Sequence, residues 1–154
     1  MNFNIHKANE NEAIKMNDLL TKLIQDERQY DSNIDASFKV SSFYEHYVDD
    51  PDRCLLVATD NTEVIGYLYG YIKPLEGGIK EQISAKLDAI FVETEYRKQH
   101  IAQSLINHFK TWCKEKNVTS LEVDVCSDNQ KAINLYRQVG FEEFKKSLKL
   151  YLEQ

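Results

Sequence analysis

Residues 87–141 constrain the fold of this chain more than any other part of its sequence. An apolar run at residues 87–92 is typical of a β-strand and leads into a basic turn at residues 97–98. Apolar residues then recur every three or four positions, which predicts a helix that begins close to Gln99. A second strand, residues 120–126, and a second helical segment follow. This order of strand, helix, strand and helix predicts a mixed α/β fold.

The turn before the first of these helices has the features of an anion-binding site. The start of a helix exposes unpaired backbone N–H groups and the positive end of the helix dipole, and both favour a negative charge. Arg97 and Lys98 add two cationic side chains at the same place. The turn therefore indicates a site for a phosphate or pyrophosphate group, and a plain surface turn with two solvated cations is the alternative.

Length and composition point to one folded domain that spans residues 1–154. The formal net charge of -6 argues against a nucleic-acid-binding protein, which would normally carry a basic face, and it suits a cationic partner. No apolar run approaches the roughly 20 residues that a membrane-spanning helix needs, and the N-terminus lacks the features of a signal peptide. We therefore expect a cytoplasmic protein with no membrane or nucleic-acid partner.

The cysteines give no sign of a metal site. Cys54, Cys113 and Cys126 are widely spaced and form no paired metal-binding pattern. We expect three reduced thiols, with Cys54 and Cys113 in the core, and no bound metal.

The first half of the chain predicts a strand, helical segments and a hairpin. Residues 3–8 alternate as in a strand, and residues 13–24 carry an apolar stripe at helical spacing. A second helical pattern covers residues 38–47. Two apolar runs, residues 54–58 and 64–72, flank a turn and predict an antiparallel hairpin.

Several finer features concern the hairpin and the C-terminus. Gly66 and Gly70 indicate a bulge or a close approach of another element. Three tyrosines at positions 67, 69 and 71 project from one face of the strand, where they either line a pocket or pack under a helix. Residues 148–152 alternate apolar and polar side chains, which predicts a short closing strand.

Two ordered blocks in the second half of the chain resemble the GCN5-related N-acetyltransferase (GNAT) family. In the first block, Arg97 and Ala102 match the family's phosphate-binding turn, with Tyr96 and Ile101 beside them. His100 departs from the pattern, because it occupies a position where the family has glycine. The second block matches the family's last helix and the residues around it: Val125, Asn129, Ala132, Tyr136, Gly140 and Phe141.

The resemblance implies a strongly bent, mixed and mostly antiparallel sheet flanked by helices, with a splayed central pair of strands. It also implies acetyl-CoA as the acetyl donor. Phe91 and Val92 would offer backbone groups to the pantetheine arm, and the Val92 N–H is a candidate to polarise the thioester oxygen. Asn129 would cap the last helix and contact the same arm. The pyrophosphate would bind through the turn residues Arg97, Lys98, Gln99, His100, Ile101 and Ala102.

The same resemblance assigns the chemistry to a few side chains. Tyr136 falls where many members place a tyrosine near the CoA sulfur, and a phenol with a reference pKa of about 10 carries a proton at neutral pH. Asp88 falls where some small-amine acetyltransferases carry an acid that binds or deprotonates the acceptor. Glu122 and Asp124 are rivals for the role of the base. We expect His100 to lie on the first helical turn without needing a positive φ.

The polar segment after the first helix is expected to help form the acceptor site, as the corresponding hairpin does in the family. With Asp88, we expect Tyr30 and Asp31 to contact the acceptor. A solvated helix end is the alternative for this segment. Four carboxylates there lie beside Tyr30 and suit a cationic amine: Asp26, Glu27, Asp31 and Asp35.

The resemblance therefore predicts an acetyl-CoA-dependent N-acetyltransferase whose acceptor is a small cationic amine, such as a polyamine or an aminoglycoside. Two alternatives stay open. One is an enzyme that acetylates a protein or peptide amine, and the other is a non-catalytic acyl-CoA-binding module, which the departure at His100 allows. Members of the family often pair their C-terminal ends across a dimer, and by that analogy alone a homodimer is an option.

Overall fold

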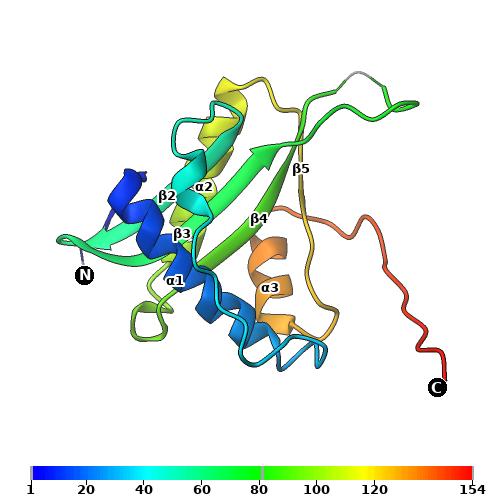
Figure 1. Cartoon of the computed structure of the whole chain (residues 1–154). Helices are drawn as coiled ribbons and strands as arrows, with labels where there is room; N and C mark the ends of the chain where they lie inside the picture. The colour runs from blue at the N-terminus through cyan, green and yellow to red at the C-terminus, as the bar shows by residue number, and fades with distance from the viewer. Residues whose placement is uncertain (1, 81, 154) are drawn as a thin grey trace.

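A five-stranded sheet forms the centre of the molecule (Figure 1). The computed structural model describes residues 2–80 and 82–153. Each adjacent pair among β1, β2, β3 and β4 is antiparallel, and β5 is parallel to β4. The mixed, mostly antiparallel sheet confirms the predicted fold class. In sheet order the strands are β1 (Asn4–Lys7), β2 (Arg53–Asp60), β3 (Glu63–Ile72), β4 (Ser84–Val92) and β5 (Ser120–Val123).

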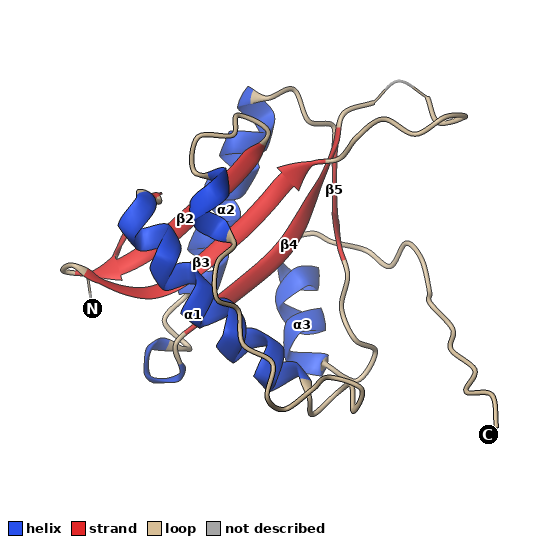
Figure 2. Cartoon of the chain, in the orientation of Figure 1, coloured by secondary structure: helices blue, strands red, loops and turns tan. Residues whose placement is uncertain are grey.

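Helices cover both faces of the sheet (Figure 2). α1 (Glu10–Glu27) packs on one face in a buried cluster around Met16. α2 (Ile101–Glu115) and α3 (Gln130–Gln138) pack on the other face in a cluster around Phe109. None of the helices in the described part of the chain is both long and apolar enough to cross a membrane.

α1 contains the helix predicted at residues 13–24 and extends it at both ends. A capping box starts the helix, because the Asn9 side chain accepts a hydrogen bond from the Glu12 N–H (2.8 Å). The Glu12 carboxylate in turn accepts one from the Asn9 N–H (3.0 Å). These two bonds satisfy donors that the helix itself leaves free. The helix ends at Glu27, at the start of the acidic segment.

The predicted hairpin is confirmed, and Gly70 on β3 explains one of its features. β2 and β3 pair antiparallel over most of their lengths. A Cβ atom placed on Gly70 would lie 2.3 Å from the ring of Phe109 on α2. Only glycine therefore allows α2 to approach the sheet this closely, which confirms the predicted close approach.

A β-bulge at Asp88 changes the direction in which β4 presents its side chains. In the pairing of β3 with β4, Tyr69 faces Ala89 and the next residue, Gly70, faces Leu87, so Asp88 has no partner. Leu87 packs in the cluster under α2, whereas Ala89 packs in the cluster under α1. Because of the bulge, the side chains of β4 after Asp88 point to the opposite face of the sheet from the one that simple alternation would give, and Asp88 is the bulged residue.

β4 and β5 diverge at this same point (Figure 1). Their last paired residues are Leu87 and Val123, so residues 88–92 of β4 have no strand on the β5 side. The splayed central pair that the family resemblance implies is thus present. It leaves backbone groups of β4 free to bind something other than a strand.

The second predicted helix, over residues 38–47, is wrong. The chain forms only a short 3-10 turn there, η1 (Tyr44–Tyr47), after an irregular segment. The apolar side chains that pack against the sheet are confined to residues 43–48, too few for a longer helix to bury one face. Tyr44 is fully buried instead, and its hydroxyl hydrogen-bonds with that of Tyr67 on β3 (3.0 Å).

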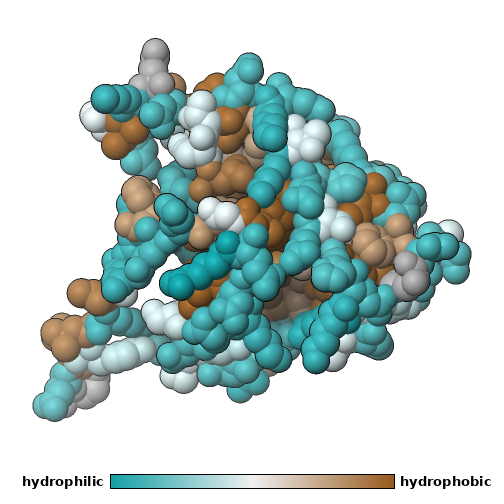
Figure 3. Space-filling model, turned by 180° about the vertical axis from the view of Figure 1, so that it is seen from behind, coloured by the Kyte–Doolittle hydropathy of each residue, from teal (hydrophilic) through white to brown (hydrophobic). Residues whose placement is uncertain are grey.

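The predicted closing strand at residues 148–152 is also wrong for the described part of the chain. Residues 141–153 have no regular secondary structure, and Figure 3 shows part of this tail projecting from the body of the molecule. The Tyr151 hydroxyl accepts a hydrogen bond from the Asn33 side chain (2.6 Å). From Phe144 on, the large apolar side chains of the tail are exposed, from 65% for Tyr151 to 92% for Leu148. Alternation gives a strand tendency, but a strand also needs a neighbour for its backbone hydrogen bonds. Pairing with a second copy stays a prediction.

Candidate functional site

A groove of about 2260 Å³ opens where β4 and β5 diverge. Its walls are formed by the end of α1, β4, the turn before α2, β5 with the loop that follows it, α3 and the C-terminal tail. The short 3-10 segment η2 (Thr94–Tyr96) leads from β4 into that turn. Of the residues predicted to bind donor or acceptor, all line the groove except Gln99. Gln99 lies between two residues with left-handed backbone, where the chain turns sharply.

The backbone of Val92 faces the groove. The Glu93 N–H donates to the Ile65 carbonyl on β3 (2.8 Å). Because backbone groups alternate along a strand, the N–H and carbonyl of Val92 point away from β3. Arg97 Nε donates to the Val92 carbonyl from this side (2.8 Å). Val92 therefore presents to the groove the backbone edge that the family resemblance assigns to the pantetheine arm, with its carbonyl bound by Arg97.

The backbone of Phe91 faces the other way, which corrects part of the prediction. Its carbonyl oxygen would lie 3.0 Å from a Cβ atom placed on Gly66 of β3, so this carbonyl points toward β3. The strand alternation that frees Val92 is the reason. Phe91 lines the groove with its side chain, and the guanidinium carbon of Arg97 lies 5.1 Å from the ring centroid.

The turn before α2 has a conformation suited to an anion. Lys98 (φ 64°) and His100 (φ 63°) are both left-handed, and α2 begins at Ile101. Left-handed residues in a turn can direct successive N–H groups to one side, and the first N–H groups of α2 have no partner within the helix. The expectation that His100 needs no positive φ is wrong, because it caps the helix rather than lying on its first turn.

Tyr136 on α3 lies in the groove wall. Its side chain is 9% exposed and packs edge-on against Phe141, with ring centroids 5.7 Å apart. Burial raises the pKa of Tyr136 to about 12, and the charge of Glu27 adds to this effect. At the start of the same helix, Asn129 Oδ1 accepts a hydrogen bond from the Ala132 N–H (3.2 Å), which confirms the predicted cap.

Asp88 lies between the groove and a second cavity of about 590 Å³. Its side chain is solvent-accessible, yet desolvation by the surrounding protein raises the pKa of Asp88, against the opposing charge of Lys86. Its two rivals are less available, because Glu122 pairs with Lys73 (2.8 Å) and Asp124 pairs with Lys86 (2.5 Å). Asp88 is therefore the freest of the three predicted carboxylates.

Aromatic and charged side chains wall the second cavity, which lies on the α1 side of the sheet. Arg53 is fixed there, since its guanidinium contacts Asp50 (3.1 Å) and the Tyr69 hydroxyl and lies 3.9 Å from the centroid of the Tyr47 ring. Three carboxylates and two cations give the cavity a slight excess of negative charge. The lining residues are Phe43, Asp50, Asp52, Arg53, Tyr69, Tyr71, Ile72, Lys73, Pro74 and Asp88.

This cavity settles the open question about the β3 tyrosines and adds residues that the sequence did not indicate. Tyr67 is packed under α1, whereas Tyr69 and Tyr71 line the cavity. Phe43 and Arg53 were not predicted as site residues. They come from segments that approach Asp88 only through the tertiary fold, and no local pattern marks them.

The acidic segment at the end of α1 and in the loop after it lines the groove with three of its four carboxylates. Asp26, Glu27 and Asp31 face the groove beside Tyr30. Asp35 does not, because its carboxylate accepts hydrogen bonds from the N–H (2.9 Å) and hydroxyl (2.8 Å) of Ser37. Desolvation, followed by the charges of neighbouring carboxylates, raises the pKa of Glu27.

The cysteines agree with the predicted core positions. Cys54 and Cys113 are buried free thiols, and burial raises the pKa of each to about 12. Cys126 is partly exposed in the groove wall. Among residues 2–80 and 82–153, no group of three or more His, Cys, Asp or Glu side chains is placed to hold a metal ion.

Comparisons with known proteins agree with this geometry. A sequence model of the acetyltransferase (GNAT) family matches residues 17–141. Aminoglycoside N(6')-acetyltransferase type 1 from Acinetobacter baumannii is 32% identical over 101 residues, which are 61% of this chain and 69% of that protein. A putative [ribosomal protein bS18]-alanine N-acetyltransferase from Bacillus subtilis is 25% identical over 111 residues, 72% of this chain and 68% of that one.

A solved structure shares the fold. The tetramutant of the BH1408 protein from Bacillus halodurans superimposes with a TM-score of 0.83 at 19% sequence identity. The match covers 96% of this chain and 99% of the other. With the family model matching most of the sequence, the chain belongs to the acetyltransferase (GNAT) family of N-acetyltransferases.

Proposed function

We propose that this chain uses acetyl-CoA to acetylate the primary amine of a small cationic acceptor. The position of Asp88 carries the proposal, because this carboxylate borders both the groove and the aromatic cavity. An ammonium group held there would lie between the cavity that receives the rest of the acceptor and the groove that receives the donor. Carboxylates and aromatic faces both attract cations. The similarity to an aminoglycoside acetyltransferase supports the same class of acceptor.

The groove suits acetyl-CoA in shape and in chemistry. Its backbone edge at Val92 offers hydrogen bonds to an arm that contains amides. The turn before α2 offers N–H groups, with Arg97 and Lys98 beside them for the pyrophosphate. Arg97 would have to leave the Val92 carbonyl for this, which frees the carbonyl for the arm at the same time.

Tyr136 is proposed to supply the proton that the departing sulfur needs. When bound, acetyl-CoA supplies the acetyl group as a thioester. The amine nitrogen forms the new C–N bond, the C–S bond breaks, and the sulfur takes the Tyr136 hydroxyl proton. The proton that the nitrogen then loses returns to Tyr136. A pKa of about 12 keeps this hydroxyl protonated at neutral pH. The Val92 N–H, which points away from β3, would stabilise negative charge on the thioester oxygen.

A protein or peptide amine is the second candidate acceptor. The groove is large, and the similarity to a ribosomal-protein alanine acetyltransferase favours this acceptor. The aromatic cavity at Asp88 is much smaller, about 590 Å³, and favours a small molecule instead. We therefore rank the small cationic amine first.

Two measurements test the proposal in order. Thermal unfolding with and without acetyl-CoA tests the donor, because a ligand that binds only the folded protein raises the unfolding midpoint. Thiol release from acetyl-CoA then compares spermidine and kanamycin with a peptide that has a free N-terminus. The proposal predicts a higher midpoint and a larger kcat/KM for the small amines. An unchanged midpoint at saturating acetyl-CoA would contradict it, and a preference for the peptide would favour the second candidate.

A further inference from the structure

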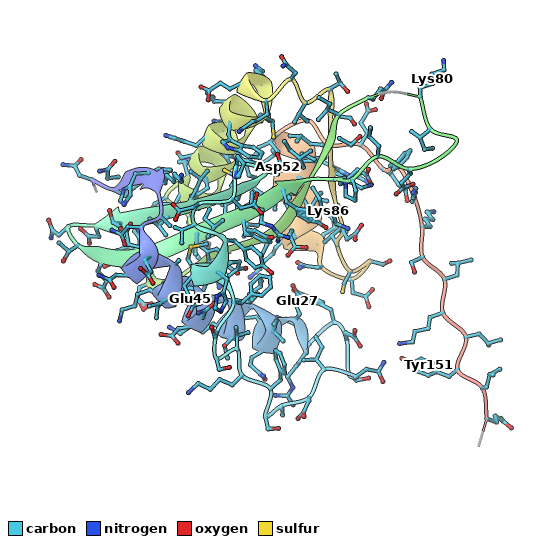
Figure 4. The ribbon with its side chains drawn as sticks, turned by 45° about the horizontal axis from the view of Figure 1, so that its top comes forward. Glu27, Glu45, Asp52, Lys80, Lys86 and Tyr151 are labelled. Atoms are coloured by element: carbon cyan, nitrogen blue, oxygen red, sulfur yellow. The ribbon has the colours of Figure 1, made fainter. Side chains whose placement is uncertain are left out.

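Glu27 lies in the groove but has no role in the acetyl transfer proposed above. It is the last residue of α1, on one face of the sheet, whereas Tyr136 belongs to α3 on the other face. The sheet would separate the two if β4 and β5 stayed paired. Because the strands diverge after Leu87, both residues line the same groove, and the charge of Glu27 raises the pKa of Tyr136. Figure 4 labels Glu27 at the end of α1 and Lys86 on β4.

The Glu27 carboxylate is half-buried and uncompensated. No hydrogen bond from the described residues reaches it, and the charges that act on it most are negative. Desolvation is the main cause of its raised pKa, and the neighbouring carboxylates add to it. The titratable groups that share its surroundings come from α1, the following loop, β3, β4, the β5–α3 loop and α3: Asp26, Asp31, Tyr67, Asp88, Cys126 and Tyr136.

Asp88 has surroundings of mixed charge. Desolvation raises the pKa of Asp88 as it does that of Glu27, and Asp124 adds to the rise, but the cations Lys86 and Arg53 oppose it. A carboxylate with cations beside it is a poorer proton acceptor, and its place beside the aromatic cavity suits it to hold an ammonium group. The two carboxylates are therefore suited to different tasks, binding for Asp88 and proton removal for Glu27.

We infer that Glu27 is the general base of this site, a role that rests on the proposed acetyl transfer. Its carboxylate takes one proton from the acceptor ammonium, directly or through one water. The N–H bond breaks, an O–H bond forms on Glu27, and the nitrogen keeps the electron pair with which it attacks. The proton then passes to solvent through the open groove, so that Glu27 is restored for the next turnover.

Glu27→Gln is the first test, with Asp18→Asn as the matched control. Asp18 is an exposed carboxylate on the same helix and does not line the groove. Replacing a general base lowers kcat by about 100-fold or more. We expect that loss for Glu27→Gln at neutral pH with acetyl-CoA affinity unchanged, partial recovery in Glu27→Asp, and wild-type rates for Asp18→Asn. A Glu27→Gln protein with wild-type kcat would overturn the inference.

The pH dependence separates a base from a residue that only binds the amine. Without a base the rate follows the fraction of free amine, so the kcat of Glu27→Gln should rise about tenfold per pH unit below the amine pKa. The kcat of the wild-type protein should rise less steeply with pH. Asp88→Asn should raise KM for the amine and keep the wild-type pH profile. If Glu27→Gln instead raises only KM, Glu27 is a binding residue and the inference fails.

A third readout needs no donor or acceptor. Carbon NMR of glutamate carboxyl groups, assigned by comparison with Glu27→Gln, follows the titration of Glu27 directly. We expect a midpoint above that of an ordinary glutamate, and an ordinary or lower midpoint would contradict the inference. Wild-type protein that releases no thiol with any amine would instead refute the proposed function itself, so the two failures are distinguishable.

Discussion

Arg97, in the turn before α2, and Asp26, on the last turn of α1, form an ion pair across the groove, with 3.3 Å between Arg97 Nη2 and Asp26 Oδ2. The same guanidinium donates through Nε to the Val92 carbonyl. Arg97 thus has two partners, the Asp26 carboxylate and the Val92 carbonyl, which acetyl-CoA would have to replace. This contact joins the end of α1, on the proposed acceptor side of the groove, to the turn that is proposed to bind the pyrophosphate.

Asp26→Asn should therefore bind acetyl-CoA more tightly. Both side chains are about half exposed, and such pairs contribute at most about 1 kcal/mol, so the expected gain in affinity is at most about fivefold. Calorimetric titration at low ionic strength would measure it, with Asp18→Asn as the control. Equal or weaker binding by Asp26→Asn would show that Arg97 is not drawn to the pyrophosphate.

His100→Gly should stabilise the protein and keep or improve its affinity for acetyl-CoA. A non-glycine residue in the left-handed region costs roughly 1 kcal/mol, and glycine removes this cost. The variant also loses only one weak polar contact, from the His100 ring to Gln103 (3.2 Å). Thermal unfolding and donor titration would check both effects. A loss of affinity beyond tenfold would identify His100 as a ligand of the pyrophosphate.

The long elements could be predicted because apolar periodicity is local. The stripe at residues 13–24, the hairpin with its two glycines, and the strand before Arg97 all appear where the sequence indicates them. The helix predicted at residues 38–47 does not form, because the aromatic side chains that suggested a helical stripe are irregularly spaced. The strand predicted at residues 148–152 does not form, because alternating side chains indicate a strand tendency but provide no neighbouring strand to pair with.

The details of the site depend on contacts between distant segments. Nothing in residues 84–92 marks the bulge at Asp88, which exists only in the register between β3 and β4. The aromatic cavity likewise joins Phe43, just before η1, and residues of β2 and β3 to Asp88. Glu27 was visible in the sequence only as one of four acidic residues. Its position opposite Tyr136 needed the divergence of β4 and β5.

Tyr136→Phe should lower turnover and leave donor binding intact. The substitution keeps the ring in its place against Phe141 and removes only the hydroxyl that would protonate the sulfur. A missing general acid typically costs about 100-fold in rate. Steady-state thiol release gives kcat, and titration gives the acetyl-CoA affinity. Unchanged kcat across the accessible pH range would exclude Tyr136 from the acid role.

Glu27→Gln should also change how stability depends on pH. The pKa of Glu27 is raised above its ordinary value of 4.5, so the folded protein holds this proton more tightly than the unfolded chain does. Wild type therefore loses stability as pH rises from 4.5 through the raised pKa. Calorimetry should give Glu27→Gln a higher unfolding midpoint at neutral pH, by on the order of 2 °C, and no advantage in acid. A lower midpoint at neutral pH would contradict this.

We propose that the groove and the cavity at Asp88 together bind the donor and a small cationic amine for acetyl transfer. The most direct measurement is the rate of thiol release from saturating acetyl-CoA as spermidine or kanamycin is varied, for wild type, Asp88→Asn and the control Asp18→Asn. We predict saturable, amine-dependent release by wild type, a KM for the amine raised at least tenfold in Asp88→Asn, and wild-type behaviour in Asp18→Asn. Release that is independent of the amine, or a KM that Asp88→Asn leaves unchanged, would contradict the claim.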